Sequence, residues 1–148
     1  MNKTRLLHHL QTLLQVKVDA SQQAIDSTRH SLTSDTKSSA GDKHEVGRAM
    51  VQQELDKLEE QRVKLITLQH ELTRVPVERS FEEVAFGSLV GTDQGTYFVA
   101  IGWGRIESDG GTCFVISLAS PLGQALNGKS VGDRIAFNGR SVTITSVT

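Results

Sequence analysis

This sequence is poor in several residue types that characterise whole classes of protein. Cys113 is the only cysteine, which excludes an intrachain disulfide and a cysteine-rich zinc site and fits a reducing cytoplasm. No run approaches the ~18 apolar residues of a membrane span, and the first residues lack the apolar core of a signal peptide. We therefore expect a cytoplasmic protein with no membrane partner. With 16 basic and 17 acidic residues, the chain also lacks the basic excess of a DNA-coating protein.

Aromatic residues are missing from the first 80 positions, and all seven lie in the remainder of the chain. Eleven of the 13 glycines follow Pro76, whereas all five histidines precede it. The first part is rich in Leu, Gln, Lys and Glu, which favour helix, and the second in Gly, Val, Ile, Ser and Thr. We therefore predict an α+β protein with a helical module at residues 1–75, a linker at 76–80 and a β-rich module at 81–148.

Apolar residues recur at heptad-like spacing in two stretches of the first part. They are Leu7, Leu14, Val18, Ile25 and Leu32 in the first stretch, with Ser21 and Thr28 between them, and Val51, Leu55, Leu58, Leu65, Leu68 and Leu72 in the second. Packing the two seams antiparallel would bury both, giving a coiled-coil hairpin with its tip near residues 33–45. Homodimerisation through the same seams is the alternative. The polar break midway between the seams favours the hairpin and a monomer.

The sequence of the second part predicts short strands separated by glycine-containing turns. The predicted strands are Val84–Val90, Thr96–Gly102, Cys113–Leu118, Arg134–Phe137 and Arg140–Val147. Ser120 and Pro121 are typical of a helix start, and Gly128 of a helix end. The Asn138-Gly139 pair predicts a tight hairpin. We expect about five mostly antiparallel strands with one short helix against them.

Asp42 and Glu45 are the candidate functional residues at the predicted tip. Their spacing also fits a capping box, in which Asp precedes the helix and Glu follows three residues later. A capping box stabilises the helix without any binding partner. The two interpretations are compatible, because a capping carboxylate can remain exposed. Two carboxylates make a weak Mg²⁺ site, since that ion keeps its waters. We therefore expect no tightly bound cofactor, and any Mg²⁺ here would be shared with another macromolecule.

Two other residues invite a chemical interpretation. Cys113 could be a nucleophile, but its apolar strand and the lack of histidine in its half of the chain favour a small core residue. His44 lies beside the tip acids and could act as a ligand or base, although a lone surface histidine is more often neither.

Residues 120–133, Ser-Pro-Leu-Gly-Gln-Ala-Leu-Asn-Gly-Lys-Ser-Val-Gly-Asp, closely resemble the C-terminal domain of the bacterial Gre transcript-cleavage factors. That family has Ser-Pro, an Ala-Leu pair, Gly-Lys and Gly-Asp at this spacing, and Phe86-Gly87-Ser88 matches the start of its domain. At the other end of the chain, Gly41-Asp42-x-x-Glu45 matches the acidic tip of the family's coiled coil. The similarity in architecture extends over nearly the whole chain.

The resemblance implies a fold and a function. The second module would have an FK506-binding-protein-like fold and dock on bacterial RNA polymerase, with Ser120, Pro121 and Leu122 binding the partner. The coiled coil would enter the polymerase secondary channel and reach the nascent RNA 3′ end. Asp42 would stabilise a shared Mg²⁺, and Glu45 would assist the metal or orient the attacking water. The factor would stimulate cleavage of backtracked RNA without being an enzyme itself.

The sequence also departs from the family at two places. Where the family continues Asn-Ala-Glu-Tyr after the tip, this chain has Val46-Gly47-Arg48-Ala49, and Ala119 stands where Asp or Asn often precedes Ser-Pro. These departures motivate an alternative, a channel-binding modulator or inhibitor that does not stimulate cleavage. Two other hypotheses are a peptidyl-prolyl isomerase, suggested by the fold alone, and a coiled-coil adaptor in which the tip acids are only caps.

Overall fold

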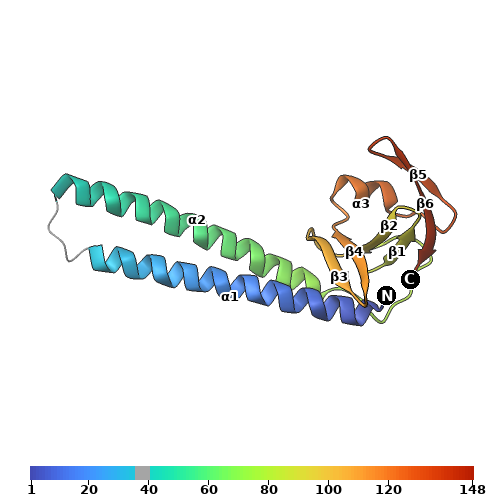
Figure 1. Cartoon of the computed structure of the whole chain (residues 1–148), viewed down its shortest axis with the longest axis horizontal. Helices are drawn as coiled ribbons and strands as arrows, with labels where there is room; N and C mark the ends of the chain where they lie inside the picture. The colour runs from blue at the N-terminus through green and yellow to red at the C-terminus, as the bar shows by residue number, and fades with distance from the viewer. Residues whose placement is uncertain (36–40) are drawn as a thin grey trace. The chain divides into compact units, whose positions relative to one another are not determined.

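The computed structural model describes the backbone of residues 1–35 and 41–148 and the side chains of residues 1–33 and 45–148. Two long helices packed antiparallel as a hairpin precede a mixed six-stranded sheet with one short helix (Figure 1). This arrangement confirms the predicted α+β class. The chain forms two compact units, one of Met1–Gln11 with His70–Thr148 and one of Thr12–Gln69. The boundary predicted at residues 76–80 stays a prediction.

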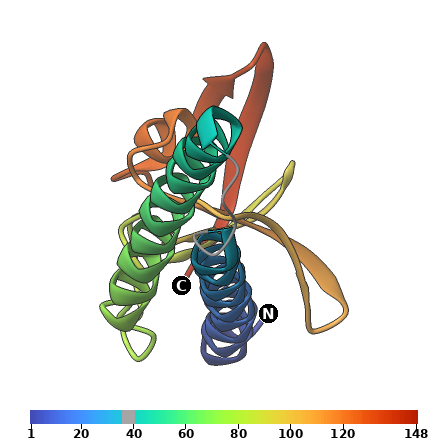
Figure 2. The same cartoon turned by 90° about the vertical axis from the view of Figure 1, so that its left-hand side faces the viewer.

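The hairpin consists of α1 (Lys3–Asp35) and α2 (Gly41–Thr73), which run in opposite directions (Figures 1 and 2). Inside the second unit, Arg29 Nη2 lies 2.6 Å from Glu59 Oε1. Gln69 Nε2 donates to Gln15 Oε1 at 2.9 Å. The earlier residue of α1 contacts the later residue of α2, as antiparallel packing requires. Both helices extend into the predicted loop, and its remaining residues, 36–40, lie outside the described part.

Most of the predicted seam of α1 faces the hairpin interior. Leu14, Val18 and Ile25 are buried, and Ser21 and Thr28 are half-buried. Leu7 and Leu32 are half-buried too. The buried residues of the first two turns are Leu6 and Leu10. They precede Leu14 in steps of four, so the apolar stripe departs from the heptad at the start of the helix.

The seam of α2 contains polar residues that heptad counting did not include. Leu55 and Leu72 are buried, whereas Val51, Leu58 and Leu65 are half-buried. Residues of one helix face recur every three or four positions. Arg62 and Gln69 fill the two gaps of seven residues that this spacing leaves between the leucines, and both are half-buried. The Nε of Arg62 and the Oγ of Ser21 are buried atoms with no hydrogen-bond partner among the described residues. The hairpin interface is therefore mixed, with apolar layers interrupted by polar ones.

The sheet has the strand order β3-β4-β2-β1-β6-β5. The elements are β1 (Leu89–Thr92), β2 (Gly95–Val99), β3 (Gly104–Ser108), β4 (Gly111–Ile116), α3 (Pro121–Leu126), β5 (Arg134–Phe137) and β6 (Arg140–Val147). Neighbouring strands are antiparallel except β2 and β4, which are parallel. The strands predicted at residues 134–137 and 140–147 are confirmed with their bounds, and Asn138 (φ 50°) and Gly139 (φ 75°) form the turn.

Strand β3 was not predicted. Its only buried side chain is Ile106, so it lacks the apolar run that marks the other strands. It pairs with β4 through a two-residue turn at Asp109 (φ 53°) and Gly110 (φ 73°), with Ser108 opposite Gly111. Positive φ at both turn residues is the geometry that suits a tight hairpin. The Asp-Gly pair was the available signal for this strand.

The first strand begins later than predicted. Residues 85–88 form a turn centred on Phe86 and Gly87, and β1 starts at Leu89. Gly87 has φ +95°, and a Cβ there would overlap the ring of Pro76, so only glycine fits. The hydroxyl of buried Ser88 donates to the carbonyl of Ala85 at 2.7 Å and closes a tight turn. The apolar character of this segment reflects burial of a turn.

The core of the sheet unit lies between α3 and one face of the sheet. Its buried residues are Val84, Val90, Val99, Leu126, Ile135, Val142 and Ile144. Side chains alternate along each strand, so Phe98 projects from the opposite face to Val99, and both are buried. Cys113 is also fully buried, which confirms its prediction as a core residue. Both faces of the central strands are therefore covered.

Candidate functional site

The two predicted tip acids lie at the start of α2. The helix begins at Gly41, so Asp42 is its second residue and lies in the first turn, whereas the sequence predicted Asp42 at the capping position before the helix. Glu45 follows three residues on and is exposed. Residues three apart on a helix are neighbours on its surface. The side chains of Asp42 and His44 lie outside the described residues, so the capping contact stays a prediction.

The surroundings of Glu45 combine an acid with a nearby base. Arg48 is exposed and lies three residues after Glu45, on an adjoining position of the helix surface. Acidic groups near a helix N-terminus are favoured by the helix dipole. Among side chains of residues 1–33 and 45–148, no group of three or more His, Cys, Asp or Glu could hold a metal ion. Two carboxylates would thus supply only part of a Mg²⁺ coordination shell.

The predicted partner-binding residues lie at the start of α3, in the sheet unit. Ser120 is the N-cap of this helix, with φ −67° and ψ 156°. Its hydroxyl accepts from the Gly123 amide at 3.0 Å and donates to the Ser117 carbonyl at 2.7 Å. Pro121 occupies the first turn, where its fixed φ suits a helix and its missing N–H costs nothing. These bonds fix the loop without any partner.

Only one of the three predicted partner-binding residues is fully exposed. Pro121 is exposed, whereas Ser120 is half-buried and both polar functions of its hydroxyl are used within the loop. Leu122 is half-buried and packs against the core cluster. Gln124, which was not predicted, is exposed, and its side chain donates to the Ala119 carbonyl at 3.0 Å. Of the three predicted partner-binding residues, Pro121 is therefore the one with an exposed side chain, and a role in binding stays a prediction.

Gly123 makes this loop possible. A Cβ at this position would overlap the carbonyl oxygen of Ser117 and the backbone of Leu118. The close approach lets Ser120 reach Ser117 and the Gly123 amide together. The Gly in the Ser-Pro-Leu-Gly motif thus has a steric role, which the sequence pattern alone did not reveal.

A second set of contacts, also unpredicted, attaches the start of α1 to the sheet unit. Lys3 Nζ donates to the carbonyls of Arg79 at 2.6 Å and Thr148 at 2.8 Å. Its ammonium also lies 5.2 Å from the ring centroid of Phe81, and the Arg79 guanidinium lies 5.0 Å from the same centroid. Partial burial lowers the pKa of Lys3. These residues are far apart in the sequence, so no local pattern could have predicted the contacts.

Comparison with known proteins adds no assignment. No protein-family model matches the chain, and no curated protein matches it. Within the described residues, no helix has both the length and the apolar character needed to cross a membrane.

Proposed function

We propose that this protein is a regulator of bacterial RNA polymerase of the Gre type. It enters the secondary channel with its helical hairpin and stimulates cleavage of backtracked nascent RNA by the polymerase. The second module, which we expect to be FK506-binding-protein-like, docks on the polymerase through the surface around Pro121. The resemblance of residues 120–133 and of Gly41-Asp42-x-x-Glu45 to that family is the basis of the proposal.

The single structural observation that supports it most is the position of the tip acids. Each helix of the hairpin has 33 residues, a length of roughly 50 Å. Asp42 and Glu45 lie in the first five residues of α2, at the end where the chain reverses. An exposed Glu45 at this end of a narrow helical pair can be presented inside a channel too small for a globular domain.

The donor set suits a shared Mg²⁺ rather than a resident one. Mg²⁺ requires six oxygen ligands in near-octahedral geometry and usually takes one or two carboxylates from a protein, together with water and substrate phosphates. In a two-metal site, the ion stabilises the attacking and leaving oxygens of the displacement. In the proposed complex, Asp42 supplies a carboxylate to the ion, and Glu45 assists it or accepts a hydrogen bond from the attacking water.

A transcript-cleavage assay tests the proposal directly. Purified protein is added with Mg²⁺ to a backtracked elongation complex of bacterial RNA polymerase, and the RNA is resolved by length. Shortened RNA should appear and should be lost with Asp42→Ala or Glu45→Ala. Glu54→Ala removes an exposed acid farther along α2 and is the matched control, which should cleave normally. Absence of binding to polymerase would refute the proposal.

A channel-binding modulator without cleavage activity is the second candidate. The observation that favours it is the exposed Arg48, three residues from Glu45, where the family has a further acid. A positive charge beside the tip weakens the attraction of its carboxylates for a cation. In the same assay this candidate predicts polymerase binding and altered pausing with no RNA shortening. Arg48→Glu should then introduce cleavage, whereas robust cleavage by the unaltered protein would exclude this candidate.

A further inference from the structure

Aromatic rings gather on the face of the sheet that carries α3. Tyr97 on β2 and Phe114 on β4 are register partners, and their ring centroids are 5.9 Å apart. Phe137 on β5 follows the core residue Ile135 by two positions, so it projects from the same face. Phe114 is 37% exposed, unusual for so large an apolar side chain. The rings thus form a partly open aromatic surface.

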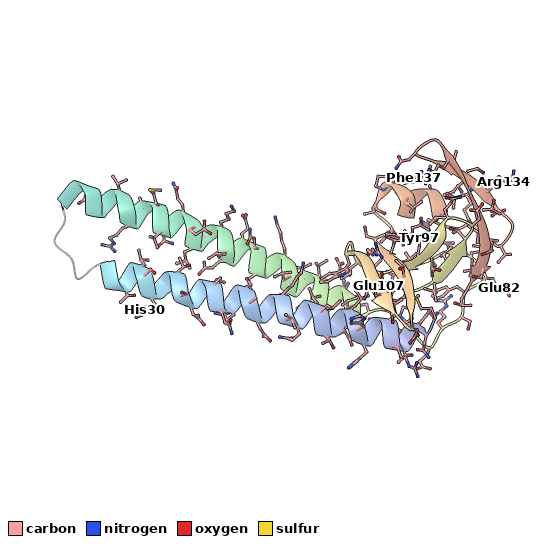
Figure 3. The ribbon with its side chains drawn as sticks, in the orientation of Figure 1. His30, Glu82, Tyr97, Glu107, Arg134 and Phe137 are labelled. Carbon is pink, nitrogen blue, oxygen red and sulfur yellow. The ribbon has the colours of Figure 1, made fainter. Side chains whose placement is uncertain are left out.

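A surface cavity lies between two of these rings. It has a volume of about 360 Å³ and is lined by Gln94, Tyr97, Phe137, Asn138, Arg140 and Val142. Tyr97 and Phe137 can be followed in Figure 3, where both lie on the sheet unit. The volume falls in the range of small-molecule sites. Burial raises the pKa of the Tyr97 hydroxyl above its ordinary value.

The polar side chains around the cavity are unused within the described part of the chain. Gln94, Asn138 and Arg140 have no side-chain hydrogen bond or ion pair there. Arg140 is the only charged lining residue. Asp93, in the β1–β2 turn beside Gln94, accepts from the Thr143 amide at 2.9 Å, and Glu107, on the opposite edge strand β3, pairs with Arg105 at 2.8 Å. The cavity therefore offers two amides and one cation beside aromatic faces.

We propose that this surface binds a single-stranded nucleic-acid segment, with one base held at the cavity. Bases stack on aromatic rings whatever their sequence, and arginine provides a cation for the adjoining phosphate. The amides of Gln94 and Asn138 match the donors and acceptors on a base edge. The inference that the surface binds a single strand stands on the cavity alone. The identification of that strand as the extruded nascent RNA rests on the proposed function.

Fluorescence anisotropy with the isolated full chain tests this inference. The probe is a 5′-labelled single-stranded RNA about eight nucleotides long, within the usual site size of such surfaces. We expect a Kd tighter than roughly 0.1 mM, the weak limit of non-specific binding. Phe137→Ala should raise the Kd by about tenfold through lost stacking. Arg140→Gln should raise it several-fold and reduce the salt slope by about 1.

Arg134→Gln is the matched control, because Arg134 is an exposed arginine on the same hairpin but projects from the opposite face. It should leave both the Kd and the salt slope unchanged. Equal losses in the Arg134 and Arg140 variants, equal binding of a duplex of the same sequence, or no binding would each overturn the inference. Preference for an acidic peptide over RNA would also overturn it. Because this assay contains no polymerase, its outcome does not decide the cleavage proposal, which the transcript-cleavage assay tests separately.

Because Phe137 is half-buried, the folded state of its variant must be verified by circular dichroism. Gln94→Ala provides an independent test at an exposed position and should also weaken binding. A labelled mononucleotide in place of the oligomer distinguishes a free nucleotide from a strand as the ligand. Tight mononucleotide binding with no gain from the longer RNA would contradict strand recognition.

Discussion

Arg5 and Asp109 form an ion pair with 3.2 Å between Nη1 and Oδ1, which joins the first turns of α1 to the β3–β4 turn. The other carboxylate oxygen of Asp109 accepts from the backbone N–H of Asn2 at 3.0 Å. Both contacts lie within the unit formed by Met1–Gln11 and His70–Thr148. With the Lys3 contacts, they incorporate the beginning of α1 into the unit that contains the sheet.

The pH dependence of this attachment follows from the pKa of Asp109. The hydrogen bonds from Asn2 and Arg5 hold the pKa of this carboxyl below its ordinary value of 3.8. A group whose pKa is lower in the folded state contributes stability above its unfolded-state pKa and loses it as the pH falls through the folded-state value. Asp109→Asn should therefore lower the melting temperature at neutral pH but hardly change it in strong acid.

Asparagine suits this test because it tolerates the positive φ at this position. Glu78→Gln is the control, since Glu78 is an exposed acid of the same unit. Thermal unfolding of each variant at neutral and strongly acidic pH provides the measurement. The same decrease at both pH values would show that the Asp109 charge is not what stabilises the attachment.

The cap of α3 predicts a second effect. Ser120→Ala removes the acceptor for the Gly123 amide and the donor to the Ser117 carbonyl. Losing an N-cap hydroxyl should cost about 1 kcal/mol of unfolding free energy. Urea denaturation of the full chain measures the loss, and Ser120→Thr, which keeps a hydroxyl, should recover most of it. If alanine and threonine are equally destabilising, the hydroxyl is not the stabilising group.

Elements defined by neighbouring residues could be predicted from the sequence. The Asn138-Gly139 pair predicted the hairpin of β5 and β6, because the two residues of a tight turn determine where its strands end and begin. The Ser120-Pro121 helix start is local in the same way. Strand β3 was missed because Ile106 is its only buried side chain, and the strand is defined by its pairing with β4 rather than by an apolar pattern.

The contacts that could not be predicted are those between distant residues. Arg5 and Asp109 are 104 positions apart, and the Asp109-Gly110 pair indicates only a turn, not the ion pair with Arg5. The rings of Tyr97 on β2 and Phe137 on β5 flank one cavity although β1 and β6 lie between these strands in the sheet, an order that sequence alone did not reveal. At the tip, spacing identified Asp42 and Glu45, and whether they hold a metal depends on a partner outside this chain.

The polar layer of the hairpin predicts a stabilising substitution. The hydroxyl of Ser21 is buried without a hydrogen-bond partner among the described residues, which is unfavourable for a polar group. Ser21→Ala removes the unsatisfied group and should raise the free energy of unfolding by about 1 kcal/mol. Alanine also has the higher helix propensity, so Ser27→Ala on the exposed face of α1 must be measured beside it. Equal gains in the two variants would show that burial of the Ser21 hydroxyl contributes nothing.

The burial of Cys113 makes a prediction about its reactivity. Desolvation is the main cause that raises the pKa of this thiol from 9.0 to about 11. Two pKa units reduce the thiolate fraction at pH 8 by roughly a hundredfold, and the thiolate is the reactive form. The side chain is also inaccessible in the folded protein.

Ellman's reagent should therefore detect no thiol in the native chain and one after unfolding in guanidinium. An added exposed cysteine, Ala136→Cys, should react at once and verify the assay. Rapid labelling of Cys113 in the native protein would mean that the sheet core opens on the timescale of the reaction, which would contradict the packing described here.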